Sequence, residues 1–274
     1  MRIGNMDNNK NTTPINVEDI LAMACKLPYC KISRDAFLTI QLKGKVSEKQ
    51  LADALENGTV NAGISIDILN KLASGAIGFE TAKATAISTA AGIPGGFAMI
   101  GAIPADLVQF YAHVFRIAQK LAYIYGYKDI NLDDGMQNIL MIFLGVMFGV
   151  NAAVAALAKL AAANAAKIGA KVAAKPLSRY AIYNIAKKVL AWIGVKLTKD
   201  GVGKAVSKAV PVVGGVVSGG LTVATFLPMA KKLQKELSKF AAMSPENLDK
   251  ASAVADIILT DFEILADNAD KVSI

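Results

Sequence analysis

Side chains that bind metals, form disulfides or attack substrates are scarce in this sequence. Two cysteines, one histidine and one tryptophan occur among 274 residues. Two cysteines exclude a disulfide scaffold, and Cys25 and Cys30 alone cannot complete a zinc site. A single histidine excludes a metal centre with several histidine ligands. The sequence therefore predicts no metal and no cofactor.

Charged residues are also infrequent, at 19% of the chain, whereas hydrophobic residues make up 54%. Average globular chains have about 25% charged and about 45–50% apolar residues. A chain this apolar cannot be intrinsically disordered, because disorder requires low hydrophobicity and high charge density. At about 150 residues per domain, the length fits one large domain or two domains.

Targeting and catalytic motifs are missing as well. Residues 1–19 are polar and contain no apolar run of the kind that a secretory signal needs, so we expect a cytoplasmic protein with reduced thiols. Residues 201–205 resemble the end of a phosphate-binding loop, but Thr198 replaces its first glycine and Ala205 its hydroxyl residue. With no other catalytic motif present, we expect a protein that is not an enzyme.

Charge is distributed unevenly along the chain. Residues 1–158 carry 13 basic and 13 acidic side chains, residues 159–239 carry 15 basic and two acidic, and residues 240–274 carry two basic and seven acidic. A basic block followed by an acidic tail indicates either that the tail packs on the block or that the block binds an anionic partner. Nucleic acid is not expected as that partner, because no nucleic-acid-binding motif is present.

Three long uncharged spans occupy residues 84–105, 135–158 and 209–230. Each approaches the roughly 20 residues that cross a bilayer, yet each could equally be buried core. Pro94, Gly95 and Gly96 predict that the first span is two helix ends and a turn. All three spans contain glycines four residues apart, which allow close helix packing: Gly92 with Gly96, Gly145 with Gly149, and Gly215 with Gly219.

Helical patterns cover most of the chain, and the predicted class is all-α, a multi-helix bundle with long, apolar, Gly-rich central helices. Cap residues, prolines and glycines place the helix boundaries. The only candidate strand is the Val-rich run at residues 212–217. The predicted helices run from Asn16 to Pro28, Ser33 to Gly44, Ser47 to Asn57, Ile64 into the first uncharged span, Pro104 to Gly126, Asn131 toward Lys175, over residues 177–197, and onward from Ser244.

A polar stripe runs along the predicted helix after Pro104. Its members, with Lys120 after them, recur at steps of three or four residues and so share one helix face. A carboxylate, the only imidazole and a guanidinium in line fit a proton-handling site, a solvated face, or a polar network between helices. The stripe consists of Asp106, Gln109, His113 and Arg116.

The predicted helix over residues 177–197 is basic and amphipathic. Ile182, Ile185, Val189 and Ile193 mark its apolar face, with Asn184 and basic residues opposite and Trp192 at the boundary. This pattern is typical of membrane-surface helices, although a lysine-rich face over a protein core gives the same pattern. The residues expected to meet anionic lipid are Lys167, Lys171, Lys175, Arg179, Lys187, Lys188, Trp192, Lys196, Lys199, Lys204 and Lys208.

Two segments resemble the EcsC family of bacterial proteins. They are the run AGIPGGFAMIGAIPADLVQFYAHVFRIAQKLAYIYGY at residues 91–127 and the run KAVSKAVPVVGGVVSGG at residues 204–220. The resemblance implies a helical, membrane-associated protein whose family namesake is encoded beside an ABC-type transporter. It implies an EcsC-like helical domain over residues 17–243, and it carries over no catalytic residue.

Taken together, these patterns favour a non-enzymatic, amphitropic protein at the inner face of the cell membrane. Its basic block, residues 159–239, and its Gly-rich apolar hairpins would bind anionic lipid, a transporter or another membrane protein. The alternatives are a pore-forming, toxin-like effector that inserts the same hairpins, and a lipid carrier or unrecognised enzyme with a pocket near the polar stripe. We expect residues 1–16 to form a flexible tail and residues 244–274 to form an acidic helix packed on the domain.

Overall fold

A computed structural model of the chain describes residues 17–91, 99–100, 103–128, 130, 139–166, 177–199 and 211–272. Within these ranges, only the backbone is described at residues 88–91, 99–100, 103–104, 106, 192, 194–199, 211–222 and 269–272. Ten α-helices and one pair of two-residue strands make up the described regular structure, so the all-α class is correct.

The first three helices begin and end close to the predicted residues. They are α1 (Val17–Lys26), α2 (Arg34–Leu42) and α3 (Glu48–Asn57). The predicted capping box at the start of α3 is present, with Gln50 N donating to Ser47 Oγ at 3.2 Å and Ser47 N donating to Gln50 Oε1 at 3.4 Å. Such reciprocal bonds satisfy amide groups that the first helical turn leaves unpaired, which fixes where α3 starts.

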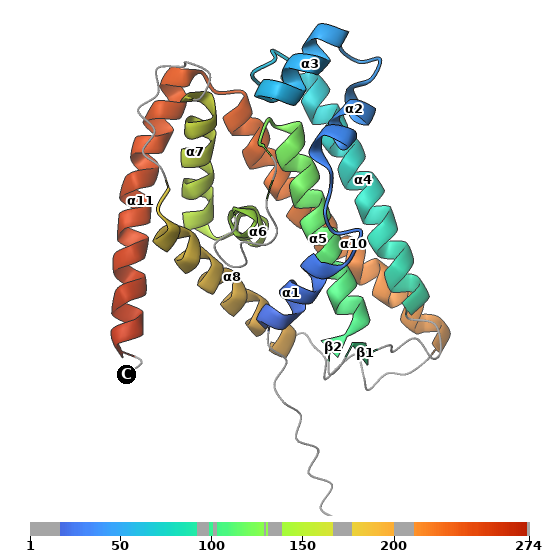
Figure 1. Cartoon of the computed structure of the whole chain (residues 1–274). Coiled ribbons are helices and arrows are strands. Elements are labelled where there is room, and N and C mark those ends of the chain that lie inside the picture. Colours follow the sequence, from blue (N-terminus) through green and yellow to red (C-terminus); the bar gives the residue numbers. More distant parts are fainter. Residues whose placement is uncertain are drawn as a thin grey trace, which may run out of the picture.

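Three long helices lie beside one another, and the polar stripe lies on the second of them (Figure 1). They are α4 (Ile66–Ala91), α5 (Ala105–Ile124) and α10 (Pro211–Ala241). Between α4 and α5, the strands β1 (Met99–Ile100) and β2 (Ile103–Pro104) pair in antiparallel fashion. The first uncharged span thus contains the end of α4, whereas the turn predicted at Pro94, Gly95 and Gly96 lies outside the described residues. A strand pair as short as β1 and β2 leaves no alternating pattern in the sequence.

The short apolar helix α6 (Leu140–Phe148) occupies the middle of the molecule (Figure 1). It contacts α5, α10, α7 (Asn151–Ala166) and α8 (Arg179–Lys199). The last helix, α11 (Pro245–Val272), runs along α7 and also touches α8. Residues 140–147 of α6 are all buried, because neighbouring helices cover every side of it.

The prediction of one continuous helix from Asn131 toward Lys175 is wrong. Gly149 adopts a left-handed conformation with φ 86° and ends α6, and α7 starts two residues later. Gly145 lies at the close approach between the two helices, since a Cβ atom there would lie 2.5 Å from Ala153 Cβ. The expectation that both glycines serve helix packing therefore holds for Gly145, whereas Gly149 is a helix-ending residue.

The Val-rich run at residues 212–217, the one candidate strand, is helical and lies within α10. That helix begins at Pro211 and continues past the exposed Pro228, where solvent can bond the carbonyl that a proline leaves unpaired. Gly215 and Gly219 fall in the part of α10 for which only the backbone is described, and Gly92 and Gly96 lie outside the described residues. Among the helices that the structure describes, none has the length and hydropathy needed to cross a membrane.

Candidate functional site

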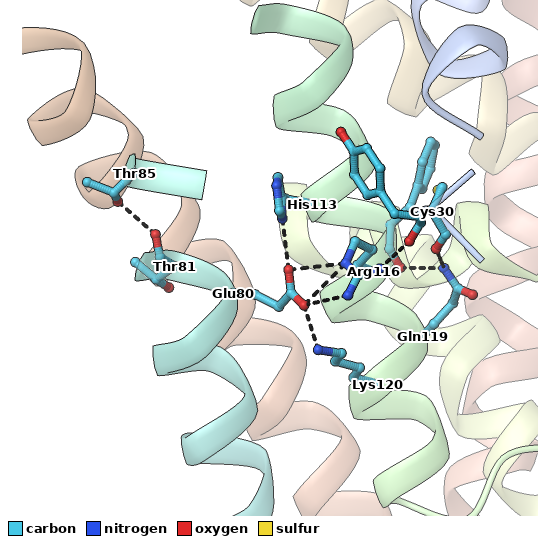
Figure 2. Close-up of polar contacts among 10 residues, drawn as sticks. Cys30, Glu80, Thr81, Thr85, His113, Arg116, Gln119 and Lys120 are labelled. Atoms are coloured by element: carbon cyan, nitrogen blue, oxygen red, sulfur yellow. Dashed lines mark hydrogen bonds and ion pairs between the residues drawn. The ribbon is translucent and has the colours of Figure 1, made fainter. Parts of the chain in front are cut away.

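The central polar feature is a fully buried carboxylate, Glu80 of α4, which points toward α5 (Figure 2). Three side chains of α5 meet it. His113 Nδ1 lies 2.8 Å from Oε2, Arg116 Nε donates to both carboxylate oxygens at 3.2 and 3.3 Å, and Lys120 Nζ donates to Oε1 at 2.5 Å. Because residues 113, 116 and 120 are separated by three and four positions, they lie on one face of α5. We call these four residues the Glu80 cluster.

Opposing effects set the ionisation of this cluster. Burial by itself raises the pKa of Glu80, but the hydrogen bonds from His113 and Lys120 and the charges of Lys120 and Arg116 outweigh it and lower the pKa to about 2. Burial lowers the pKa of Lys120, and the hydrogen bond with Glu80 counteracts that effect. Glu80 is therefore held as an anion at neutral pH, as expected for a buried carboxylate with several cationic partners.

A second layer of contacts joins the cluster to the connection between α1 and α2. Arg116 Nη1 donates to the carbonyl oxygen of Tyr29, and the guanidinium lies 5.9 Å from the centre of the Tyr29 ring. Gln119, next to Lys120 on α5, donates to the Cys30 carbonyl at 3.0 Å and accepts a hydrogen bond from Ile32 N at 3.1 Å. Side chains of this part of α5 thus bond both to α4 and to the α1–α2 connection.

The cluster's burial decides what it can do chemically. His113 and Lys120 are 3% and 7% exposed, so for them the solvated-face alternative is wrong. His113 Nε2 is buried and has no hydrogen-bond partner among the described residues. An acid or base must be within reach of the proton that it transfers, and in this conformation solvent does not reach Nε2. The geometry is that of an ion network between two helices.

Of the other predicted stripe residues, the structure describes only the side chain of Gln109, and it makes no contact with the cluster that the structure records. Gln109 is half-buried one turn before His113, and the side chain of Asp106 lies outside the described part of the structure. Glu80 was not identified from the sequence, although it is the residue around which the stripe is organised. Its signal is weak but present: Glu80 is the only acidic residue of α4 after the first turn. Pairing it with α5 required knowing that α4 and α5 are neighbours.

The second candidate site is the outer face of α8. Arg179 and Lys188 are exposed, Lys187 is half-buried, and the ring of Tyr183 lies 5.9 Å from Lys187 Nζ. Tyr180 and Tyr183 are 45% and 41% exposed. These five residues, Arg179, Tyr180, Tyr183, Lys187 and Lys188, form what we call the α8 face.

The opposite side of α8 packs into the protein. Ile185, Val189 and Ile193 are completely buried and Ile182 is half-buried, as the apolar period predicted. Asn184 departs from the prediction: it is buried instead of facing solvent, and its Nδ2 has no hydrogen-bond partner among the described residues. The reason is that α8 is contacted from several directions, by α1, α6, α7 and α11.

The remaining residues of the predicted basic surface lie, wholly or by their side chains, outside the described part of the structure. Lys167, Lys171, Lys175, Lys204 and Lys208 lie outside the described residues. Trp192, Lys196 and Lys199 belong to α8, but their side chains lie outside the described part of the structure.

Acidic residues of α11 contact the basic part of the chain. Asp256 forms an ion pair with Lys159 of α7, and Lys159 is 5% exposed. Glu263 Oε1 accepts a hydrogen bond from Ser178 Oγ at 3.2 Å, just before α8. Asp267 accepts a hydrogen bond from the hydroxyl of Tyr180. One flank of α11 therefore lies against the start of the α8 face.

Metal and thiol chemistry have little support in the described ranges. No group of three or more His, Cys, Asp or Glu side chains is arranged there to hold a metal ion. Neither Cys25 nor Cys30 forms a disulfide. A hydrogen bond with Cys25 and burial raise the pKa of the Cys30 thiol, which disfavours the reactive thiolate.

The fold and these two sites define an all-α protein with a buried ion network and an exposed basic, tyrosine-bearing helix face. Comparison of the chain with protein-family models, with curated proteins and with solved structures gave no match. The resemblance to the EcsC family stays a prediction from the residues that carry it.

Proposed function

We propose that this chain is a non-enzymatic, amphitropic helical protein that attaches to anionic membrane surfaces through the α8 face. The observation that supports this proposal is the combination of Tyr180 and Tyr183, both exposed, with Arg179, Lys187 and Lys188 on one helix. Tyrosine rings favour the headgroup region of a bilayer, where one end of the ring is apolar and the hydroxyl remains hydrated. Each Lys or Arg near an anionic leaflet contributes about 1 kcal/mol to binding.

The attachment that we propose is peripheral. The apolar side of α8 is already buried in the protein, where Ile185 and Val189 approach Gly145 of α6. A surface helix that inserts into lipid does so by burying its own apolar face, and α8 would have to leave the protein to do so. Binding through the outer face needs no such rearrangement. On this proposal the protein resides at the inner face of the cell membrane, in agreement with the membrane association that the EcsC resemblance implies, and a membrane transporter or other membrane protein is a further partner.

Flotation with vesicles tests the proposal. Full-length protein is mixed with vesicles of phosphatidylcholine alone or with phosphatidylglycerol added, at low and at high salt. We expect flotation only with the anionic vesicles and its loss at high salt, because salt screens charges that lie at the surface. A protein that floats equally with neutral vesicles, or with neither, would contradict the proposal. Binding that resists alkaline carbonate would point instead to insertion and to the pore-forming alternative.

Matched charge-reversal variants test whether vesicle binding depends on the α8 face or only on the net charge of the protein. The triple variant Arg179→Glu, Lys187→Glu, Lys188→Glu should weaken binding at least tenfold, given about 1 kcal/mol for each charge. The control variant Lys43→Glu, Lys45→Glu, Lys49→Glu changes the net charge equally at exposed positions near α2 and α3, and it should retain most of the binding. Equal losses in the two variants would show that only net charge matters.

A further inference from the structure

A cavity of about 240 Å³ lies where five parts of the chain meet, away from the Glu80 cluster and the α8 face. Its walls come from the α3–α4 connection, the residues that follow α5, α7, the end of α10 and the start of α11. A cavity of about 150 Å³ accommodates benzene, so this one has room for about ten non-hydrogen atoms.

The chemistry of the walls is uncharged and mostly apolar. All 13 lining residues are uncharged, and among them Leu237, Phe240, Met243 and Leu248 supply large apolar surfaces. A carboxylate or phosphate would lose its hydration here without meeting an opposite charge in the wall, at a large energetic cost. The walls therefore favour a neutral ligand.

One polar group in the wall is not bonded within the described part of the protein. Tyr127 is 8% exposed, and its ring packs edge-on against Phe143 at 5.5 Å between ring centres. Among the described residues its hydroxyl makes no hydrogen bond, whereas the hydroxyl of the neighbouring Tyr125 donates to Asn70 Oδ1 at 2.6 Å. Burial raises the pKa of Tyr127, so the group is a neutral hydrogen-bond donor at neutral pH. A hydroxyl on a buried ring that lines the cavity and bonds no described protein group is available to donate to a ligand.

Two asparagines in the same wall offer acceptors. Asn164 Nδ2 donates to the carbonyl oxygen of Gly126 at 3.2 Å, and Asn61 Nδ2 donates to that of Asn57 at 2.6 Å. These bonds fix both amides by their nitrogen atoms and leave the Oδ1 atoms to accept. The wall thus combines one unbonded donor with two carbonyl acceptors in a partly open, mostly apolar cavity, which is the usual composition of a small-molecule site.

We propose that this cavity binds a small neutral amphiphile, with an apolar body of about ten non-hydrogen atoms and one hydroxyl, carbonyl or amide group. The apolar body fills the space beside Leu237, Phe240 and Leu248, and the polar group bonds the hydroxyl of Tyr127. This proposal does not depend on membrane attachment, because no residue of the α8 face lines the cavity.

Calorimetric titration of the full-length protein with 1-octanol and with octanoate tests the ligand class. We expect 1-octanol to bind with a dissociation constant below about 1 mM, and octanoate to bind at least tenfold more weakly because its charge would be buried unpaired. Absence of 1-octanol binding, or equal binding of the two probes, would overturn the proposal.

Two variants and one control variant test whether 1-octanol binds in this cavity. Tyr127→Phe keeps the ring and removes the hydroxyl, and it should weaken 1-octanol binding about three- to tenfold. Ala165→Phe fills the cavity from α7 and should abolish binding, whereas Ala52→Phe, at an exposed position of α3, should bind like the wild type. Thermal melting verifies that each variant is folded, and if Ala165→Phe does not fold, Tyr127→Phe decides. Unchanged binding in Tyr127→Phe would exclude the site.

Discussion

The Nδ1 atom of His113 lies 2.8 Å from Oε2 of Glu80, with both side chains removed from solvent. The two residues are 33 positions apart and belong to different helices, α5 and α4. Their contact, together with those of Arg116 and Lys120, makes the carboxylate the common partner of three basic side chains. The stability of the α4–α5 pair therefore depends more on Glu80 than on His113, Arg116 or Lys120 alone.

Glu80→Gln should destabilise the protein by about 3–5 kcal/mol. The substitution keeps the shape of the side chain but leaves Lys120 and Arg116 without their counter-charge in a buried site, and removal of one partner of a buried ion pair has a cost of this size. Urea denaturation followed by circular dichroism at pH 7 measures the effect. Glu56→Gln, at an exposed position of α3, is the control and should change stability by less than about 0.5 kcal/mol. Equal stabilities of the two variants would show that the cluster is not stabilising.

A fall in pH should remove the contribution of Glu80 to the stability of the folded protein. The folded protein holds the pKa of Glu80 at about 2, below its ordinary value of 4.5. The unfolded chain thus binds the proton first as the pH falls, and the stabilisation is complete above pH 4.5 and declines toward pH 2. Between pH 6 and pH 3 the wild type should lose about 2 kcal/mol more than Glu80→Gln. Parallel urea denaturation of both proteins across this range makes the comparison, and identical pH profiles would contradict the assignment.

Gly145→Ala should cost about 1–2 kcal/mol, although alanine is the better helix former. The added Cβ atom would lie 2.5 Å from Ala153 Cβ and 3.2 Å from Ile185 Cγ2, so α7 and α8 would have to shift. Overpacking of this kind costs about 1–3 kcal/mol. Gly75→Ala is the matched control, because nothing lies within 4 Å of that Cβ position on α4. It should stabilise the protein by about 0.5–1 kcal/mol, and thermal unfolding of both variants distinguishes the two environments.

Local sequence signals were sufficient for much of the fold. Ser47 with Gln50 predicts the start of α3, because a capping box depends on residues a few positions apart. Ser33 occupies the N-cap of α2 as predicted, although its side chain makes no capping bond. The α8 period identified Ile185, Val189 and Ile193 as buried for the same reason. Gly149 was misinterpreted because a left-handed glycine that ends a helix and a glycine in a packed helix look alike in sequence.

The candidate sites depended on contacts that sequence spacing does not contain. The face that carries His113, Arg116 and Lys120 was visible as a stripe, but its partner Glu80 lies on a different helix. Asn184 was placed on the solvent side by its polarity, although helices on several sides bury it. The cavity beside Tyr127 is built from five separate parts of the chain, so no local pattern indicated it.

Asp267→Asn should strengthen binding to anionic vesicles about fivefold. Asp267 accepts a hydrogen bond from Tyr180 and places a negative charge at the α8 face; removal of one charge near an anionic leaflet is worth about 1 kcal/mol. Glu246→Gln is the matched control, because it removes the same charge about 31 Å farther along α11, well beyond the screening length at physiological salt. Flotation with phosphatidylglycerol-containing vesicles compares the two variants. Equal gains in both would mean that α11 acts through net charge alone, and no gain in either would mean that its acidic flank does not oppose attachment.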